Sequence, residues 1–595
     1  MQREHLPAAL AAGALAAATV ALVALSLRRP RPPEYPPTPA GPGAEAGATL
    51  VGPRTVTIDA SDPDAWRFFD FSRGAILDRN GGVLAVSVDT WDVYLNTRAW
   101  RQPADRAHVI EKVAAITRIP RATIETRLAS SEAVEVRIAI DLDYELGLRL
   151  IDADLPGVVL LPNTARIHPE GDLAAAVLGF TGLDNTGLAG IEAYYNDILQ
   201  GRPGRAVYER DTLGDPIPYG QYIATEPVPG DDLVLTIDRY LQRLAEETLA
   251  AAVKEHRASG GTIIVMDPYT GDIYALATLP SVRYSTLEAD LDASTEQKSA
   301  FKNIAVTDTY EPGSVMKVVT AAAAIDAGAV TPETTYVDNG VVDVEGVRLK
   351  NWDDGVYGTQ TMTGVLQHSI NTGAVFMQQK LGTRLFQSYL EAFGFGKPTG
   401  IDLPGEASGF FRRPEDPGYS PVDVATQSFG QSISVTPVQV MQAVAACING
   451  GNLVTPRVVK GRILPDGTRI DLQPTVVRRV ISPAASDAVR RMMGEVVAQD
   501  PDGWGRNPAR YTAGGKSGTA NIPVWGTYTD DQQIVSFIGF APLERPKLLV
   551  LVRLDQNRNL LTGTQAAGPI FARYVDEALR YLGVPPEKGT RSPLR

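Results

Sequence analysis

The chain has 595 residues, more than one hydrophobic core usually serves, so its length predicts two or more domains. Its formal net charge of −13 disfavours nucleic acid as a partner, and its single cysteine excludes an intrachain disulfide framework. The five histidines are scattered and form no H-E-x-x-H pair, so we expect neither a metal nor a cofactor.

Residues 6–27 form an uncharged, alanine-rich run. As a helix this run would extend roughly 30 Å, which is enough to cross a bilayer. It favours an uncleaved transmembrane anchor, preceded by a cytoplasmic tail of residues 1–5, over a cleaved signal peptide, whose apolar core is usually shorter. Arg28, Arg29 and Arg31 follow the run, and the positive-inside rule alone would leave the rest of the chain in the cytoplasm.

A linker is predicted over residues 28–64, where proline and glycine are frequent and large apolar residues are rare. Part of it should be a stiff polyproline II spacer. A first folded region, of mixed α/β type, is expected over residues 65–229, with helical patterns near 107–116 and 120–128. Its acidic residues and arginines show no catalytic clustering and indicate solvated faces and turns.

A second folded region is expected over residues 231–583, followed by a tail of residues 584–595. It opens with an amphipathic helical pattern, "LTIDRYLQRLAEETLAAAV", in which Asp238 is well placed as the N-cap. Two strands are predicted next, over 262–266 and 273–278, because a turn sequence separates two apolar runs.

Helical patterns dominate residues 315–446, and strands return near the end of the chain at 534–540 and 548–554, before a last helix over 567–582. Strands at both ends with helices between them predict one antiparallel sheet, helices on its faces and a helical insertion. The expected fold class of the chain is therefore α+β.

The segment "YTAGGKSGTAN" contains Gly515-Lys516-Ser517, which resembles the end of a phosphate-binding loop. That loop requires G-x-x-x-x-G-K-[ST], so that its backbone N–H groups surround a phosphate. The position of the first glycine is occupied by Arg510, and the small polar residues that follow do not begin a helix. The spacing argues against a nucleotide site, and Lys516 requires another explanation.

A serine and a lysine lie three residues apart where a loop passes into a helical run, in "TYEPGSVMKVVT". Residues at positions i and i+3 share a helix face, so we expect the Lys317 amine beside the Ser314 hydroxyl. A serine alcohol needs a base at neutral pH, and a lysine can supply it where burial or another cation lowers its pKa. S-x-x-K alone is weak evidence, because a helix N-cap followed by a surface lysine gives the same pattern.

Two further short motifs follow in order. Ser369-Ile370-Asn371 would alone indicate a helical loop, and Lys516-Ser517-Gly518-Thr519 would indicate an edge strand whose glycines admit a close ligand. Together, S-x-x-K, S-x-N and K-[ST]-G are the motif set of penicillin-binding proteins and class A β-lactamases. The predicted anchor, linker and additional N-terminal region do not suit a compact secreted β-lactamase.

The chain resembles the class B, monofunctional penicillin-binding proteins, which cross-link peptidoglycan. The resemblance extends from about residue 6 to about residue 582. It is carried by "SRGAILDRNGGVLA", "GLAGIEAYYNDILQGRPG", "LTIDRYLQRLAEE", "GQSISVTPVQ" and "SFIGFAP". It implies a serine β-lactamase-like transpeptidase domain with an antiparallel sheet and helices, an N-terminal pedestal domain of the dimerisation type and one transmembrane helix.

The resemblance also implies roles for individual residues. Ser314 would be the nucleophile and Lys317 its base, Ser369 would relay a proton to the leaving group, and Asn371 would hydrogen-bond the substrate amide. Lys516, with the backbone and hydroxyls of Ser517, Gly518 and Thr519, would hold the carboxylate of a donor peptide or a β-lactam. The backbone N–H groups of Ser314 and Thr519 would form the oxyanion hole.

The family places both domains outside the cytoplasmic membrane. We follow the family rather than the arginine count here, because large domains translocate regardless of flanking charge. The partners implied are peptidoglycan stem peptides, β-lactams as inhibitors, the cytoplasmic membrane, a polytopic glycan polymerase and division proteins. Asn371 in S-x-N, the segment "FGFGKPTGIDLPGEASG" and the short C-terminal end are typical of the division-type, septal members.

Other functions are compatible with the same motifs. An elongation-type transpeptidase would use the same acyl transfer, and a D,D-carboxypeptidase or β-lactamase would add a placed water. A non-catalytic scaffold or β-lactam sensor would keep the fold for binding, but it would not need Ser314, Lys317 and Lys516 together. The first region lacks a glutamate-centred signature, which argues against a bifunctional glycosyltransferase.

Overall fold

The structure is a computed structural model. It describes residues 67–69, 73–100, 102–182, 184–202, 204–208, 222–225, 228–287, 301–499, 505–524, 527–556, 559 and 561–588. The predicted anchor, residues 6–27, and the linker, residues 28–64, lie outside this set. Within the described residues, none of the helices has the length and apolar character needed to cross a bilayer. The chain forms two compact units, and the second includes residues 76–82 and 171–199 together with residues 232–595.

The first unit has a three-stranded antiparallel sheet with the long strand β3 at its centre. β3 (Val83–Asn96) pairs with β4 (Glu135–Asp143) on one side and β5 (Val158–Ile167) on the other. The helices α2 (Pro103–Thr117) and α3 (Arg121–Ala129) pack their apolar residues onto this sheet, which confirms the two predicted helices. The unit also contains α4 (Tyr144–Asp152) and a small sheet of β1 (Arg67–Phe69), β6 (Gly204–Tyr208) and β7 (Tyr222–Thr225).

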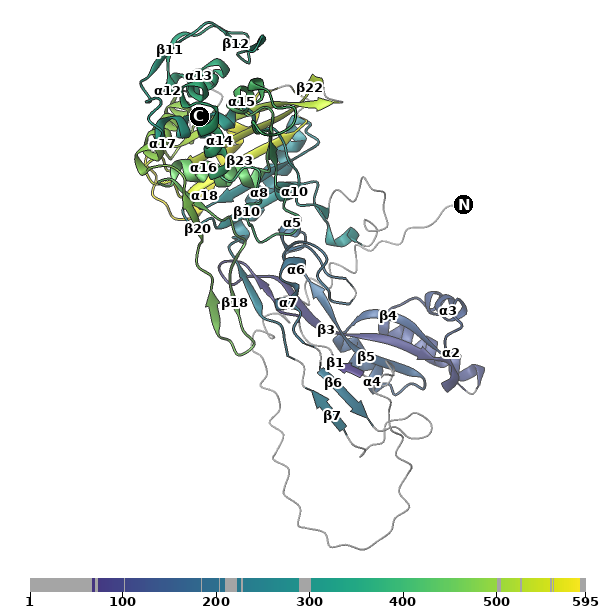
Figure 1. Cartoon of the computed structure of the whole chain (residues 1–595). Coiled ribbons are helices and arrows are strands. Elements are labelled where there is room, and N and C mark those ends of the chain that lie inside the picture. Colours follow the sequence, from purple (N-terminus) through teal and green to yellow (C-terminus); the bar gives the residue numbers. More distant parts are fainter. Residues whose placement is uncertain are drawn as a thin grey trace, which may run out of the picture. The chain divides into compact units, whose positions relative to one another are not determined.

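The core of the second unit is a five-stranded antiparallel sheet in the order β10-β9-β23-β22-β21 (Figure 1). Its strands are β9 (Gly260–Met266), β10 (Ile273–Leu279), β21 (Gly514–Val524), β22 (Thr527–Ala541) and β23 (Leu548–Asp555). Strands from both ends of the region therefore share one sheet, as predicted from the sequence. β21, which carries Lys516, is an edge strand, which confirms that prediction also.

Two amphipathic helices cover one face of this sheet. In α8 (Arg239–His256), the Asp238 carboxylate accepts from the N–H groups of Tyr240 and Leu241, so Asp238 is the predicted N-cap. α18 (Gly563–Tyr581) is the predicted last helix. Apolar residues of both helices and of the strands form one buried cluster, which fixes the sheet from that side.

Helices also make up most of the intervening segment. They are α11 (Met316–Asp326), α12 (Met362–Gln367), α13 (Asn371–Leu381), α14 (Thr383–Ala392), α15 (Pro421–Gln427), α16 (Pro437–Ile448) and α17 (Pro483–Ala498). Every residue of α16 is buried, and so are residues 316–324 of α11. A helix that is apolar on all sides lies inside a protein, so the segment that begins with Ser314 enters the interior of the unit.

Short strands, which the sequence did not predict, interrupt this mainly helical segment. β11 (Thr335–Asp338) pairs with β14 (Gly358–Thr361), and β12 (Val341–Val344) pairs with β13 (Val347–Lys350). β15 (Phe410–Phe411) pairs with β16 (Ile433–Ser434). These strands have two to four residues and are partly exposed, so they lack the long alternating pattern that identifies a strand in sequence.

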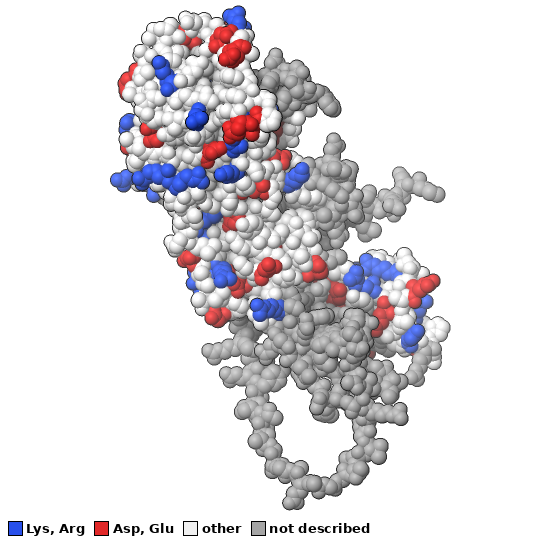
Figure 2. All heavy atoms as spheres, viewed as in Figure 1, with Lys and Arg blue, Asp and Glu red and all other residues white. Residues whose placement is uncertain are grey.

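The remaining described elements of the second unit are small. β8 (Asp232–Leu235) lies between β2 (Ile76–Leu77) and β18 (Val459–Ile463), β19 (Arg469–Asp471) pairs with β18, and β17 (Asn452–Val454) pairs with β20 (Val476–Arg479). The short helices are α5 (Ala175–Leu178), α6 (Gly190–Tyr194), α7 (Asn196–Leu199) and α10 (Ile304–Thr307). On the face shown in Figure 2, acidic and basic side chains are interspersed over the described residues, apart from one short row of lysines and arginines.

Candidate active site

Ser314 lies on a tight turn that is pressed against the edge strand β21. The turn is a single 3-10 turn, Gly313–Val315, and leads directly into α11. Gly313 has φ +54°, and a Cβ there would lie 2.7 Å from the carbonyl oxygen of Thr519. Only glycine allows this approach of the two backbones, so Gly313 lets the turn that bears Ser314 lie directly against Thr519 of β21.

Lys317 is in the first turn of α11 and its side chain is fully buried. Its Nζ donates to the Ser369 carbonyl oxygen at 2.5 Å, to Ser369 Oγ at 3.3 Å and to Asn371 Oδ1 at 2.7 Å. Burial, and then the positive charge of Lys516, lower the pKa of Lys317 well below its ordinary value. The amine is therefore placed in an environment that favours its neutral, basic form.

The Lys317 amine was expected beside the Ser314 hydroxyl, because the two residues share a helix face, but the side chain points elsewhere. Within the described residues, no hydrogen bond joins Lys317 Nζ to Ser314 Oγ. The amine is directed to the S-x-N loop instead, because a carbonyl oxygen and an amide oxygen there accept its protons. The two motifs are thus connected through the lysine.

Ser369 lies in the loop between α12 and α13 and has φ +57°. A serine in the left-handed region is uncommon, and such strained backbone persists only where surrounding contacts hold it. The Asn371 side chain is fixed at both ends, since Oδ1 accepts from Lys317 and Nδ2 donates to the Lys350 carbonyl oxygen at 2.9 Å. The predicted S-x-N residues therefore lie together beside Lys317.

Lys516 is the third residue of β21 and is 1% exposed. Its Nζ donates to Ser369 Oγ at 3.0 Å and to the Ser517 carbonyl oxygen at 3.0 Å. Burial, together with the charge of Arg506, lowers the pKa of Lys516 to about 7. The hydroxyl of Ser369 therefore lies between two lysine amines, Lys317 on one side and Lys516 on the other.

Gly518 allows β21 to lie directly against the turn that carries Ser314. A Cβ at position 518 would lie 2.6 Å from Ser536 Oγ and 2.8 Å from the Pro312 carbonyl oxygen. Thr519, the next residue, accepts at its Oγ1 from the N–H of Gly563 at 3.2 Å. A larger residue at 518 would push the strand away from the turn, which explains the need for glycine here.

Residues of all three motifs line one cleft of about 520 Å³, while Lys317 lies buried behind it. The lining residues are Gly313, Ser314, Trp352, Tyr357, Gln367, His368, Ser369, Asn371, Phe429, Gln431, Val496, Arg506, Lys516, Ser517, Thr519, Gln533, Phe537, Thr562, Thr564 and Gln565. Among these residues Arg506 and Lys516 are cations, and none is a carboxylate. A cleft with this lining favours an anionic ligand, in a protein whose own net charge is negative.

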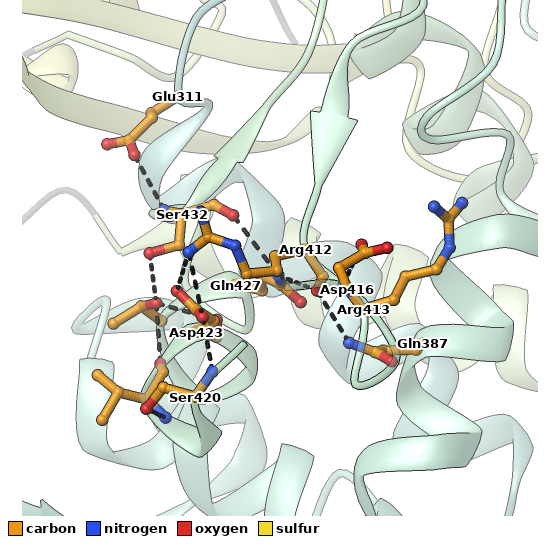
Figure 3. A network of polar contacts seen from close by, with 11 residues as sticks. Glu311, Gln387, Arg412, Arg413, Asp416, Ser420, Asp423, Gln427 and Ser432 are labelled. Carbon is orange, nitrogen blue, oxygen red and sulfur yellow. Dashed lines mark hydrogen bonds and ion pairs between the residues drawn. The ribbon is translucent and has the colours of Figure 1, made fainter. Parts of the chain in front are cut away.

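The loop 428–432 forms another part of the cleft lining and is held by a polar network (Figure 3). Glu311 Oε1 accepts from the N–H of Ser432 at 2.9 Å, and Gly313 donates its N–H to the Gly430 carbonyl oxygen at 3.1 Å. Gln427 and Gln387 both donate to the Arg412 carbonyl oxygen, at 2.9 and 3.1 Å. This network joins the loop to the turn that bears Ser314.

The sequence did not single out several residues that support this site. Trp352, Phe429 and Gln431 line the cleft, and Glu311 bonds the loop 428–432 that forms part of it. Gln431 lies in "GQSISVTPVQ" and Glu311 in "TYEPGSVMKVVT", but neither residue was assigned a role from these segments. Glu311 immediately precedes Pro312-Gly313-Ser314, which is the one local signal that could have pointed to it.

A serine on a tight turn at a cleft, together with two buried lysines that both bond one further serine hydroxyl, is typical of a serine acyl-transferase site, here on a sheet covered by helices. The sequence matches the family model of the penicillin-binding protein transpeptidase domain over residues 261–576, and that of the penicillin-binding protein dimerisation domain over residues 70–235. Stage V sporulation protein D of Bacillus subtilis is 35% identical over 87% of this chain and 80% of the relative. The chain belongs to the penicillin-binding protein transpeptidase family, with the N-terminal dimerisation domain of its class B members.

A second relative and one solved structure match over a similar share of this chain. The probable peptidoglycan D,D-transpeptidase PenA of Neisseria meningitidis is 30% identical over 87% of this chain and 86% of that protein. A crystal structure of penicillin binding protein 3 from Mycobacterium tuberculosis, complexed with aztreonam, superposes with a TM-score of 0.67 at 25% identity, covering 88% of this chain and 98% of that one. The similarity therefore includes both units.

Proposed function

We propose that this protein is a peptidoglycan D,D-transpeptidase that cross-links stem peptides through an acyl-enzyme at Ser314 and is inhibited by β-lactams. The observation that carries the proposal is the convergence of three separate motifs on one cleft, where Lys317 and Lys516 both bond the Ser369 hydroxyl. Its similarity to a probable peptidoglycan D,D-transpeptidase and to a penicillin-binding protein complexed with aztreonam supports the same activity.

The proposed acylation begins with the proton of Ser314. A neutral lysine amine has two N–H donors and one lone pair. The Ser369 carbonyl oxygen and Asn371 Oδ1 lie at 2.5 and 2.7 Å and take the two donors of Lys317, which leaves the lone pair for a hydroxyl proton. Ser314 Oγ then attacks the carbonyl carbon of the terminal peptide bond, and the N–H groups of Ser314 and Thr519 stabilise the oxyanion. One such donor is worth about 3–4 kcal/mol at a transition state.

The second half of the reaction needs a proton for the departing amine. The Ser369 hydroxyl is bonded to Lys317 and Lys516, so the proton taken from Ser314 passes through it to the leaving nitrogen as the C–N bond breaks. Asn371 hydrogen-bonds the donor amide. The amine of a second stem peptide then attacks the Ser314 ester, and Lys317 accepts its proton and returns one to Ser314.

Lys516 is proposed to hold the carboxylate of the donor peptide or of a β-lactam, with the backbone and hydroxyls of Ser517, Gly518 and Thr519. Only the charged amine binds a carboxylate strongly, and the pKa of Lys516 is about 7. We therefore expect the second-order rate constant for acylation by penicillin to fall as the pH rises above this value, by about tenfold per unit. A stopped-flow pH series on the wild type measures this basic limb.

The control for this pH dependence is Arg506→Gln. Arg506 is the second cause of the lowered Lys516 pKa, after burial, so its removal should raise that pKa and move the basic limb to higher pH. A limb that stays in place, or that moves to lower pH, would show that Lys516 is not the group that titrates.

The test of the proposed function is intact-mass measurement after incubation with penicillin, followed by product analysis with a stem peptide and an amine acceptor. A transpeptidase gains one penicillin and forms a cross-linked product. A D,D-carboxypeptidase or β-lactamase on the same motifs would release mainly hydrolysed product, and a scaffold or sensor would form none.

We further propose that residues 6–27 are a single transmembrane anchor, that residues 28–64 are its linker, and that both folded domains, 65–229 and 231–583, lie outside the cytoplasmic membrane. The proposed pathway is septal rather than side-wall synthesis, with a polytopic glycan polymerase and division proteins as partners. Asn371 and the segment "FGFGKPTGIDLPGEASG" support this assignment by their likeness to division-type members.

A single fusion tests topology and pathway together. A protein that fluoresces outside the cytoplasm, attached after Arg595, should be fluorescent and should gather at midcell, because the C-terminal domain is proposed to act at the septum. A fusion without fluorescence would indicate that the C-terminal domain lies in the cytoplasm, as the arginines after residue 27 alone would predict. A fluorescent signal along the side wall, with rounded cells on depletion, would move the protein to the elongation class.

A further inference from the structure

The first turn of α13, which begins at Asn371, is capped by a residue from another element. The first N–H groups of a helix have no partner inside the helix and need an acceptor from outside. The residue before Asn371 gives no side-chain cap. Asn351, which follows β13, supplies it instead, because its Oδ1 accepts from the N–H of Asn371 at 3.1 Å and from the N–H of Thr372 at 3.2 Å.

Asn351 is in turn held by a buried carboxylate. Asp338 ends β11 and is 1% exposed, and Asn351 is 3% exposed. Asp338 accepts from Asn351 Nδ2 at 3.0 Å, from the Tyr357 N–H at 2.8 Å and from Thr372 Oγ1 at 2.5 Å. The carboxylate therefore bonds both the capping residue and the second residue of the capped helix, so it fixes their relative position.

The first turn of α13 and the loop before it carry the hydrogen-bond acceptors of Lys317, the proposed base. Asn371 Oδ1 and both oxygens of Ser369 are the three partners of Lys317 Nζ. Ser369 also has a strained backbone, with φ +57°, which needs support from its surroundings. A shift of the first turn of α13 would move these acceptors, and with them the amine of Lys317.

We propose that Asp338 and Asn351 are positioning residues of the active site: Asn351 fixes the start of α13, and Asp338 fixes Asn351, so that Ser369 and Asn371 hold Lys317 in line with Ser314. Neither residue touches the cleft, and neither exchanges a proton with substrate. This inference rests on the proposed function, because it assigns the two residues to the acylation step.

The principal test compares Asn351→Ala with the wild type in stopped-flow acylation by penicillin. The variant loses the cap while every group that lines the cleft remains. We expect the acylation rate constant k2 to fall roughly 10- to 100-fold, as it does when reacting groups move by about 1 Å. The dissociation constant K of the noncovalent complex should change by less than about threefold, since Lys516 and the cleft are intact.

A matched control separates positioning from a general loss of stability. Asp402 is a buried carboxylate, 8% exposed, that accepts from the N–H groups of Val458 and Val459 at 2.6 and 2.8 Å, away from Lys317. Asp402→Asn should lower Tm to a similar extent and leave k2 unchanged. Slowing of k2 in both variants to the same degree would overturn the inference, because loss of stability alone would then explain the effect.

A second variant tests the role of Asp338. Asp338→Asn keeps the size of the side chain, but an amide has one acceptor oxygen and cannot accept from Asn351 Nδ2, the Tyr357 N–H and Thr372 Oγ1 as the carboxylate does. We expect k2 to fall in this variant also, with K changed by less than about threefold. A wild-type k2 in Asp338→Asn would contradict the role given to Asp338.

The outcomes distinguish this inference from the proposed function. If the wild type is not acylated, the proposed function fails and the inference fails with it. If the wild type is acylated and Asn351→Ala reacts with the same k2, only the positioning role is overturned. A lower k2 in Asn351→Ala, with K unchanged and Asp402→Asn normal, supports it.

Discussion

Replacement of Ser314 by alanine is expected to abolish covalent attachment of penicillin to this protein. Ser314 lies on the turn Gly313–Val315, which packs against Thr519 of β21 and leads directly into the helix that carries Lys317, and its side chain lines the cleft. Alanine keeps the backbone of the turn and removes the nucleophile. Intact-mass measurement should show one added penicillin on the wild type and none on Ser314→Ala, and peptide mapping should place the adduct on Ser314.

Ser517→Ala is the matched control, because Ser517 also places a hydroxyl in the cleft. It should still gain the full penicillin mass on Ser314, although more slowly, since part of the carboxylate site is lost. An adduct on Ser314→Ala, or labelling of the wild type at a residue other than Ser314, would contradict the assignment of the nucleophile.

The second large effect is expected for Lys317→Ala, which should slow acylation by roughly 10²–10⁴-fold, the usual contribution of a general base. The amine is fully buried, is held by Ser369 and Asn371, and has a pKa well below its ordinary value, all of which suit a base rather than a surface cation. Stopped-flow measurement of k2 at saturating penicillin isolates this chemical step.

Two further substitutions at position 317 separate a base from other roles. Lys317→Met keeps most of the buried volume, so a loss equal to that of Lys317→Ala would come from the amine and not from a cavity. Lys317→Arg keeps the charge but cannot lose its proton near neutral pH. Acylation by Lys317→Arg at close to the wild-type rate, with Tm preserved, would show that position 317 acts as a cation.

Much of the fold follows from patterns along the chain. The amphipathic repeat after Asp238 predicted α8 and its N-cap, and the apolar runs at 262–266 and 548–554 predicted strands that the structure contains. Such patterns succeed where an element is long enough to repeat its contact with the core. β11 and β13 were missed because each has four residues and little burial.

For the candidate site too, some features could be predicted from short patterns in the sequence and others could not. The candidate residues could be found along the chain, because each belongs to a short motif; they are Ser314, Lys317, Ser369, Asn371 and Lys516. That Lys516, from an edge strand, reaches the hydroxyl of Ser369 at 3.0 Å across 147 residues of sequence is visible only in the folded protein. The same holds for the cap of α13, which comes from Asn351, for which no motif gives a signal.

The physical reason lies in the range of the interactions. Helix caps, turns and face periodicities depend on residues a few positions apart, so they can be read from the chain directly. The lowered pKa values of Lys317 and Lys516 depend on burial and on nearby charges, which arise only when the sheet closes against α11 and the edge strand meets the turn of Gly313. The sequence therefore names the candidate groups, and the packing of distant segments sets their pKa values and brings them to one cleft.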